Sequence, residues 1–189
     1  MLKRIIDLSL SVISLLITLP FYPLIALAIK IDSKGPIFYV QSRVGLKGKK
    51  FNVIKFRTMS TTPSFASAIT VKNDPRITKS GKLLRRYKID EWPTILNVIK
   101  SEMSFVGPRP ESPKYVELYS EQQKKVLEVK PGITDPATIS FNNESELMID
   151  TNGSEGIYIK EIMPRKLAIN LKYIENQNLT ADVKIIFQT

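Results

Sequence analysis

The sequence predicts an α+β protein that is mainly helical and anchored to a membrane by its N-terminus. Three observations predict this class: a long uncharged apolar stretch broken by prolines, one β-hairpin signal, and helical patterning over most of the rest. The 189 residues, 43% of them hydrophobic, suffice for one domain with a core. We expect a re-entrant membrane anchor over residues 1–32. A single cytosolic unit should follow over residues 33–189, with its helices packed at the membrane interface.

The composition narrows the possible chemistry. The net charge is +10, from 28 Lys and Arg against 18 Asp and Glu, which favours anionic partners such as phosphate-bearing substrates, nucleic acid or an acidic membrane surface. The chain contains no Cys and no His, which excludes disulfides, thiolate nucleophiles, and the commonest general base and zinc ligand. Any enzymatic chemistry would therefore depend on carboxylates, hydroxyls, lysines, or a hard metal ion such as Mg²⁺ bound through oxygen.

The membrane segment begins near the N-terminus. No charged residue occurs between Leu8 and Ile29, and this run, as one helix, would reach roughly 33 Å. A secretory signal peptide fits poorly, because the run is too long and lacks a small-x-small cleavage site. Pro20 and Pro23 should break the helix, since each removes a backbone hydrogen bond. Asp7, just before the run, is expected to be an interfacial or capping carboxylate rather than a catalytic one.

The charges that flank this segment predict its topology. Lys3 and Arg4 precede it, while Lys30 and Lys34 follow it. Cationic residues prefer the cytoplasmic side of a membrane, so a basic flank at each end suggests that both ends stay there. A re-entrant helix–break–helix with its break at Pro20 satisfies both observations, and a kinked spanning helix is the alternative.

Residues 37–40 and 51–56 have the pattern of two strands joined by a basic loop, which predicts a hairpin. Residues 55–59 follow the second strand, and their alternation is expected to put Lys55 and Arg57 on one face. The Ser/Thr-rich residues 58–70 are expected to form a loop over a site, and residues 142–156 a polar loop. Helices are expected over residues 79–87 (burying Leu83 and Leu84), 94–100, 112–129 and 157–178 (with a kink or restart at Pro164), followed by a short apolar tail.

Two adjacent carboxylates, Asp90 and Glu91, stand out because they are surrounded by cations. The nearby cations are Arg85, Arg86 and Lys88. A Gly-Pro-Arg-Pro turn, which fixes Arg109, comes shortly after. Carboxylates set among cations are expected where a metal ion meets an anionic phosphate. Alternatively, Asp90 is the N-cap of a helix that begins at Glu91.

At this point the order and spacing of short motifs indicate a family. The motifs are Lys3-Arg4-Ile5-Ile6-Asp7, Gly35-Pro36, Gln41-Ser42-Arg43-Val44-Gly45, Lys55-Phe56-Arg57-Thr58-Met59, Asp74-Pro75-Arg76-Ile77-Thr78, Leu84-Arg85, Asp90-Glu91-Trp92-Pro93, Asn97-Val98-Ile99, Met103 to Pro110, and Lys130-Pro131-Gly132-Ile133-Thr134. Together they resemble the bacterial sugar transferases, the small monotopic polyprenyl-phosphate phosphoglycosyl transferases, over nearly the whole chain. Larger members carry an additional multi-span N-terminal region, so the resemblance is to the minimal catalytic form.

This resemblance implies a reaction and a location. The family transfers a sugar 1-phosphate from a UDP-sugar to undecaprenyl phosphate and releases UMP, with Mg²⁺ as cofactor. It acts at the cytoplasmic face of the bacterial inner membrane and begins the assembly of a capsule, exopolysaccharide, O-antigen or glycoprotein glycan. The re-entrant helix of the family breaks at a proline, here Pro20. Inner-membrane lipid is then an expected partner, nucleic acid is not, and a homodimer and downstream glycosyltransferases are further suggested partners.

The family's Asp-Glu dyad falls on Asp90 and Glu91. Our hypothesis is that Asp90 attacks the sugar-bearing phosphorus, while Glu91 holds Mg²⁺. Direct transfer, with Asp90 only positioning the metal, is the alternative. The substrate phosphates would be bound by four cations, of which Arg85 and Arg109 rank ahead of Arg57: Lys55, Arg57, Arg85 and Arg109.

The chain departs from the family pattern at two places. Leu19 stands where small members often carry Ser before the proline, and Asp135-Pro136-Ala137-Thr138 replaces a Gly and an aromatic-Ala-Gln run. A second class of function is a non-catalytic, membrane-anchored basic protein that binds acidic lipid or nucleic acid. That class gives no reason for adjacent carboxylates inside a cationic cluster.

Overall fold

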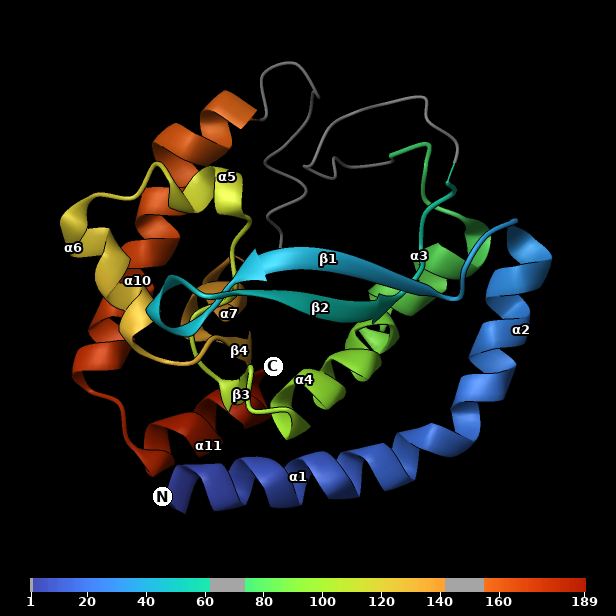
Figure 1. Cartoon of the computed structure of the whole chain (residues 1–189), viewed down its shortest axis with the longest axis horizontal. Coiled ribbons are helices and arrows are strands. Elements are labelled where there is room, and N and C mark those ends of the chain that lie inside the picture. Colours follow the sequence, from blue (N-terminus) through green and yellow to red (C-terminus); the bar gives the residue numbers. More distant parts are fainter. Residues whose placement is uncertain (1, 62–73, 142–154) are drawn as a thin grey trace.

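The computed structural model describes residues 2–61, 74–141 and 155–189, where helices dominate and the strands are short (Figure 1). This confirms the predicted α+β, mainly helical class. The two loops predicted over residues 58–70 and 142–156 lie mostly outside the described residues. In chain order the elements are α1 (Leu2–Thr18), η1 (Leu19–Phe21), α2 (Tyr22–Asp32), β1 (Phe38–Val44), η2 (Leu46–Gly48), β2 (Lys50–Phe56), α3 (Lys79–Arg86), η3 (Ile89–Thr94), α4 (Ile95–Ile99), β3 (Ser104–Val106), α5 (Pro113–Val116), α6 (Glu121–Lys124), η4 (Lys125–Glu128), β4 (Gly132–Thr134), α7 (Pro136–Ser140), η5 (Tyr158–Ile162), α10 (Met163–Glu175) and α11 (Leu179–Gln188). The η elements are 3₁₀ turns, except η5, which is a π-helix.

The N-terminal helix breaks where the prolines predict. The 3₁₀ turn η1 contains Pro20 and separates α1 from α2, which turns away from α1 so that the two helices border two sides of the molecule (Figure 1). The hydroxyl of Thr18 donates to the carbonyl of Ser14 at 2.8 Å, just before the break. A hydroxyl is therefore present near the kink, although Leu19 stands where the family resemblance implies a serine.

Helix α1 buries polar residues and exposes apolar ones, the reverse of the pattern in a helix of a soluble protein. The residues that it buries against the rest of the chain are polar: Asp7, Ser11 and Thr18. The exposed side chains of α1 to α2 are large and apolar, namely Leu2, Ile5, Val12, Ile13, Leu16, Ile17, Leu19, Phe21, Leu24, Leu27 and Ile31. By length and composition, the segment Leu2–Asp32 is one candidate membrane helix. An exposed apolar surface of this extent is expected only where a membrane or partner covers it.

The start of α1 is fastened to the middle of the chain. The guanidinium of Arg4 donates to the carbonyls of Val98 and Ile99 at 2.6 and 3.0 Å, at the C-terminal end of α4. Asp7 is only 5% exposed and accepts hydrogen bonds from the hydroxyl of Ser104 and the backbone N–H of Phe105 in β3. The prediction that Asp7 caps a helix is therefore wrong, because this carboxylate lies inside α1 and joins it to a strand, whereas its place at a membrane interface stays a prediction.

The end of α2 is fastened to the same body. Asp32 accepts from the backbone N–H and the hydroxyl of Ser80 at 2.6 and 2.8 Å, in the first turn of α3. Ile29, 1% exposed, packs with Phe56 and Leu84 in one core cluster. Both ends of the apolar segment are thus attached to one folded unit.

The predicted hairpin is present, and its strands are longer than expected. β1 and β2 pair antiparallel from Phe38↔Phe56 to Val44↔Lys50, which leaves a short basic turn in which Lys47 has a φ of 55°. β1 extends to Val44 because the N–H of Val44 donates to the carbonyl of Glu111 at 2.9 Å. β2 ends at Phe56 as predicted, and the N–H of Arg57 still donates to the carbonyl of Ile37 at 2.8 Å, but the side chains of Lys55 and Arg57 have different partners.

The outer edge of β2 is covered by side chains rather than by a third strand. Thr94 donates to the carbonyl of Ile54 at 3.0 Å. Asn97, fully buried, accepts from the N–H of Ile54 at 3.2 Å and donates to the carbonyl of Asn52 at 2.7 Å. These bonds satisfy the strand edge and hold η3 and α4 against β2.

A second, parallel pair was not predicted. β3 pairs with β4 through Ser104↔Gly132 and Val106↔Thr134. The backbones approach so closely after β3 that a Cβ on Gly132 would lie 2.2 Å from the nitrogen of Gly107. Glycine is therefore required there, and the pairing places the turn after β3 beside the turn after β4.

Three helix predictions need correction. The helix expected over 112–129 begins at Pro113 as predicted but is broken into α5, α6 and η4, because Ser120 forms a capping box that starts a new helix. Leu83 is 57% exposed, whereas Leu84 is buried as predicted. The apolar tail forms a further helix, α11. The restart at Pro164 is confirmed by the change from η5 to α10.

Candidate active site

The adjacent carboxylates lie on the 3₁₀ turn η3. Lys88, the residue before this turn, lies between α3 and η3 and has the left-handed conformation, with a φ of 54°. Asp90 lies inside η3, so the alternative that it is a helix N-cap is wrong. Because a 3₁₀ turn rotates by about 120° per residue, neighbouring side chains point in different directions. Asp90 and Glu91 therefore face different groups.

Glu91 is bound by two cations. Its Oε1 accepts from the Nζ of Lys55 on β2 at 2.6 Å and from the guanidinium of Arg109. Burial by itself would raise the pKa of Glu91, but Arg109 and Lys55 outweigh burial and hold the pKa far below its usual value. Burial, together with Arg109, lowers the pKa of Lys55, and Glu91 opposes this shift.

Asp90 has a different environment. No side chain among the described residues donates a hydrogen bond to its carboxylate. Burial and the negative charge of Glu91 raise its pKa above the usual value, against the opposing effects of Lys55 and Arg85. A carboxylate that is more basic than usual, and that accepts no side-chain hydrogen bond from these residues, is suited to act as a nucleophile.

Arg85 faces the same region from α3. Its Nε donates to the hydroxyl of Thr58 at 2.8 Å, which orients the guanidinium. Burial lowers the pKa of Arg85, while Asp90 and Asp74 favour its charged form. An arginine stays charged at any physiological pH, so this group is a fixed cation near Asp90.

Arg57 is not brought to the carboxylates. It is 3% exposed, and its guanidinium donates to the carbonyls of Pro36, Ser33 and Lys34 and to the hydroxyl of Ser33. Those bonds tie the turn after α2 to the end of β2. Arg86 and Lys88 are exposed, in keeping with surface cations. Of the four predicted phosphate ligands, the structure thus gathers Lys55, Arg85 and Arg109.

The kink of the N-terminal segment packs directly beside η3. Ile89 and Trp92, on either side of the carboxylates, pack against the cluster of Ile29, Phe56 and Leu84. Phe21 meets the ring of Trp92 edge-on, with the ring centroids 6.3 Å apart. The carboxylates therefore lie next to the end of the exposed apolar surface.

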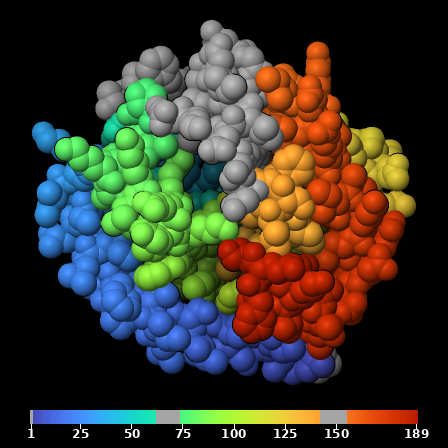
Figure 2. Space-filling model, turned by 180° about the vertical axis from the view of Figure 1, so that it is seen from behind, coloured from blue at the N-terminus to red at the C-terminus, as the bar shows by residue number. Residues whose placement is uncertain are grey.

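The site opens into a hollow. In the view of Figure 2, the surface is recessed beside the green residues of α3 and η3, with teal residues of the β2 region visible at its floor. The hollow is thus bordered by the elements that carry Glu91 and Lys55.

Mg²⁺ can be accommodated here only with help from a substrate. No group of three or more acidic side chains that could hold a metal is present in residues 2–61, 74–141 and 155–189. Mg²⁺, however, is usually held by one or two carboxylates plus substrate phosphates and water. Oε1 of Glu91 is committed to two cations, and its Oε2 accepts no hydrogen bond within the described ranges. The residues present fit a phosphate-dependent Mg²⁺ site with Glu91 as ligand.

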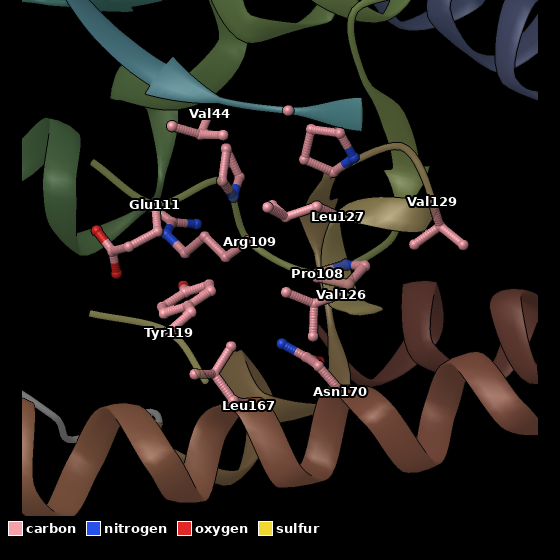
Figure 3. A pocket seen from close by; sticks show the side chains of 13 residues that line it. Val44, Pro108, Arg109, Glu111, Tyr119, Val126, Leu127, Val129, Leu167 and Asn170 are labelled. Atoms are coloured by element: carbon pink, nitrogen blue, oxygen red, sulfur yellow. The ribbon is translucent and has the colours of Figure 1, made fainter. Parts of the chain in front are cut away.

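A separate cavity lies under the turn that carries Arg109. Figure 3 shows its lining by Glu111, Tyr119, Leu167 and Asn170 together with Arg109. Its volume of about 20 Å³ is room for one water molecule, which the unpaired Oδ1 of buried Asn170 could bind. This cavity is too small for a sugar nucleotide, so the hollow at η3 is the candidate active site.

Sequence reasoning missed three residues that build the site. Thr94 and Asn97 fasten η3 to β2, and Asp135 accepts from the N–H of Arg109 at 3.0 Å. A buried polar side chain among apolar neighbours was the available signal for Asn97. No local signal indicated the partner of Asp135.

Comparison with known proteins gives a consistent result. A family model described as "Bacterial sugar transferase" matches residues 1–189. The chain is 40% identical over 196 residues to the "Undecaprenyl-phosphate glucose phosphotransferase" of Komagataeibacter xylinus, covering 99% of the chain and 35% of that protein. It is 36% identical over 199 residues to the "UDP-glucose:undecaprenyl-phosphate glucose-1-phosphate transferase" of Escherichia coli K12, covering 100% of the chain and 39% of the relative. It is also 37% identical to the "Exopolysaccharide production protein PSS" of Rhizobium leguminosarum, covering 100% of the chain and 92% of that protein. The chain thus spans little more than a third of the first two relatives.

Proposed function

This chain belongs to the bacterial sugar transferase family, and we propose that it transfers a sugar 1-phosphate from a UDP-sugar to undecaprenyl phosphate, with release of UMP. The relatives are named for this reaction with UDP-glucose, and others for exopolysaccharide production, which supports the donor, the acceptor and a role in glycan synthesis. A homodimer and contacts with downstream glycosyltransferases stay predictions.

The observation that carries the mechanism is the unequal environment of the two carboxylates. Glu91 is neutralised by Lys55 and Arg109, whereas Asp90 has a raised pKa and no side-chain hydrogen bond from the described residues. Pairs of titratable groups with pKa values shifted apart often divide the chemical roles between them. We assign the nucleophile to Asp90 and the binding of Mg²⁺ to Glu91.

The reaction would proceed in two displacements at one phosphorus atom. In the first, an Oδ of Asp90 bonds to the sugar-bearing phosphorus while the bond to the bridging oxygen breaks, and UMP leaves with that oxygen. In the second, a phosphate oxygen of the polyprenyl phosphate bonds to the same phosphorus, and the acyl phosphate bond to Asp90 breaks. The products are a lipid-linked sugar diphosphate and a regenerated carboxylate. Two steps allow a soluble nucleotide and a bulky lipid to use one site in turn.

The cations make the approach of a carboxylate to a diphosphate tolerable. Arg85 is fixed near Asp90 by Thr58, and Arg109 and Lys55 stand beside Glu91. Preorganised cations stabilise charge that develops in a phosphoryl-transfer transition state. Mg²⁺, when bound with substrate at Glu91, would further neutralise the phosphate oxygens. A non-catalytic polyanion-binding protein would gain nothing from carboxylates placed among these cations.

The attachment of the apolar segment supports a re-entrant topology. Arg4 fixes the start of α1 to α4, and Asp32 fixes the end of α2 to α3. Since both ends are attached to one soluble unit, the segment would enter and leave the membrane on the same side, which we propose is the cytoplasmic face. The chain has no Cys, so single cysteines introduced at Lys34 and at Ser9 can be probed in intact cells. A membrane-impermeant thiol reagent should label neither position from outside. Labelling of either would indicate a spanning helix.

The function is tested by UMP release. The purified full chain in detergent or nanodiscs is given undecaprenyl phosphate, Mg²⁺ and a panel of UDP-sugars that begins with UDP-glucose. We expect UMP release and a lipid-linked product with one donor, and loss of both when the lipid phosphate or Mg²⁺ is omitted. Binding of nucleic acid or acidic vesicles without turnover on any donor would contradict the proposal.

A further inference from the structure

Asp135 is a buried acid that is bound by the backbone of two separate segments. It follows β4 and is fully buried. Its Oδ2 accepts from the backbone N–H of Arg109 at 3.0 Å and from the hydroxyl of Thr138 at 3.1 Å. Its Oδ1 accepts from the backbone N–H of Thr138 at 2.7 Å. The described residues form no ion pair with this carboxylate, so hydrogen bonds alone compensate for its burial.

The arrangement requires a carboxylate rather than an ordinary helix cap. Capping α7 through the N–H of Thr138 needs only one acceptor oxygen, which Ser, Thr or Asn would also supply. A second acceptor oxygen is needed because the N–H of Arg109 approaches from another strand end. Among side chains of this length, only an aspartate offers acceptors on both of its terminal atoms.

The backbone of Arg109 is otherwise held by the parallel pair. The N–H of Gly107 donates to the carbonyl of Thr134 at 3.1 Å, and the N–H of Gly132 donates to the carbonyl of Pro108 at 3.0 Å. The prolines on both sides of Arg109 restrict φ in the turn. Asp135 adds the bond at Arg109 itself, and the guanidinium at the other end of this residue reaches Glu91.

From this chain of contacts we infer that Asp135 is a positioning residue, which fixes the main chain of Arg109 so that its guanidinium meets Glu91 at the edge of the hollow. This inference rests on the proposed function, because it assigns Asp135 a role in presenting Arg109 to the diphosphate. Asp135 also caps the start of α7, where its side chain accepts from the backbone N–H of Thr138. One buried carboxylate thus joins the main chain of Arg109 to the start of α7.

The test uses a variant that keeps the shape of the side chain. In Asp135→Asn, one terminal atom becomes an amide NH₂, which cannot accept a hydrogen bond, so either Arg109 or Thr138 loses its acceptor. In Asp135→Ser, the backbone cap of α7 is retained, while the bonds of Oδ2 to the N–H of Arg109 and to the hydroxyl of Thr138 are lost, and Thr138→Val isolates the second of these losses. We expect kcat/KM for the UDP-sugar to fall about 10- to 100-fold in both variants. Thr138→Val keeps both backbone bonds of Asp135 and should leave kcat/KM within about 2-fold.

A double-mutant cycle distinguishes positioning from a merely structural role. If Asp135 acts through Arg109, then Asp135→Ser in an Arg109→Ala background should lower kcat/KM by less than about 2-fold further. Full additivity of the two losses, or equal activity of Asp135→Ser and wild type, would overturn the inference.

A binding measurement separates this inference from the proposed function. Trp92 is the single tryptophan of the chain and adjoins Glu91, so its fluorescence can report UDP binding in the presence of Mg²⁺. We expect Asp135→Ser to weaken UDP binding about 10-fold in the wild-type background and not in the Arg109→Ala background. A wild-type protein that neither binds UDP nor releases UMP would refute the proposed function. A wild-type protein that does both, with Asp135→Ser binding UDP equally well, would refute the inference alone.

Discussion

Asp90 and Glu91 lie next to each other on the η3 turn, but their carboxylates have different electrostatic environments. Both residues are acidic, adjacent and partly buried on the same turn. The pKa of Glu91 is lowered because Lys55 and Arg109 contact it, whereas the pKa of Asp90 is raised by burial and by Glu91. The difference comes from residues on β2 and after β3, so it is created by the tertiary fold.

The comparison teaches how one dipeptide can serve two chemical roles. A carboxylate held by two cations is stably ionised and suited to hold a metal ion together with a substrate phosphate. A neighbouring carboxylate without those bonds keeps its oxygens available for attack. Substitutions at these residues and at the cations around them test this division of roles.

The largest effect is expected for Asp90→Asn. An amide cannot form the acyl phosphate, so kcat should fall by at least about 10³-fold. Glu91→Gln, which keeps an acceptor for Lys55, should lower kcat by about 10- to 100-fold.

The free energy of unfolding should change in the opposite order, with the larger loss in Glu91→Gln. Glu91→Gln leaves Lys55 and Arg109 without their anion and should destabilise the protein by about 1–3 kcal/mol. Asp90→Asn should stay within about 0.5 kcal/mol of wild type. Steady-state kinetics and urea unfolding measure both effects, and the reverse pattern would contradict the assignment of roles.

A smaller contrast is expected between two arginines. Arg109→Ala should raise the KM for the UDP-sugar by at least about 10-fold, because it removes a cation beside Glu91. Arg57→Ala leaves the carbonyls of Ser33 and Pro36 without their donor and should lower stability by about 2–4 kcal/mol. The KM of the folded Arg57→Ala fraction should equal that of wild type. Kinetics at a temperature well below the unfolding midpoint of each variant make this comparison.

The smallest effect is a shift in pH dependence. Attack requires ionised Asp90, so kcat/KM should fall as the pH drops through a pKa that lies above the usual aspartate value. Glu91→Gln removes one of the charges that raise this pKa, so the acidic limb should move to lower pH. The acidic limb should move only part of the way towards the usual aspartate pKa, because burial raises the pKa of Asp90 more than Glu91 does. An unmoved limb would exclude Asp90 as the group that titrates.

The lowered pKa of Glu91 and the raised pKa of Asp90 make the stability of the fold depend on pH in opposite directions. The lowered pKa of Glu91 contributes stability above its unfolded-state pKa, and this contribution is lost as the pH falls through the folded-state value. The raised pKa of Asp90 means that the folded protein binds this proton more tightly, so ionisation of Asp90 reduces stability as the pH rises. Unfolding of Asp90→Asn and Glu91→Gln across the acidic range should therefore show opposite changes in slope.

Much of the fold could be predicted where the pattern is local. The uncharged run with Pro20 and Pro23 predicted the break at η1, and alternating residues predicted the hairpin of β1 and β2. Asp90, Glu91, Lys55, Arg85 and Arg109 were identified from charge spacing and family resemblance. The structure places Lys55 and Arg109 on Glu91, and the roles of these residues in catalysis and phosphate binding stay predictions.

The remaining features depend on contacts between distant residues. β3 and β4 have three residues each and pair across a separation of 28 positions, too short and too distant for any periodic signal. The hydrogen bond between Asp135 and the backbone N–H of Arg109 depends on that pairing, so the sequence did not indicate it either. Arg57 does not reach the carboxylates because its guanidinium is bound by Ser33, Lys34 and Pro36, partners that no local sequence pattern indicated.

The helices α1 and α10 show why burial could not be inferred from polarity alone. α10 buries Met163, Leu167 and Tyr173, as a helix of a soluble domain does. α1 buries Asp7, Ser11 and Thr18 and exposes its apolar residues. The sequence predicted a membrane contact for α1, but the polar face that docks it to β3 became visible only in the structure.

The most direct test of the account is to trap the intermediate on Asp90. The protein is mixed with Mg²⁺ and a UDP-sugar labelled in the sugar, without lipid phosphate, quenched rapidly in acid, and digested for mass spectrometry. We predict a phosphosugar on the peptide that contains Asp90, formed with one equivalent of UMP and discharged when undecaprenyl phosphate is added before the quench. Turnover of the same preparation with no UMP burst and no modified Asp90 would contradict the covalent route and favour direct transfer.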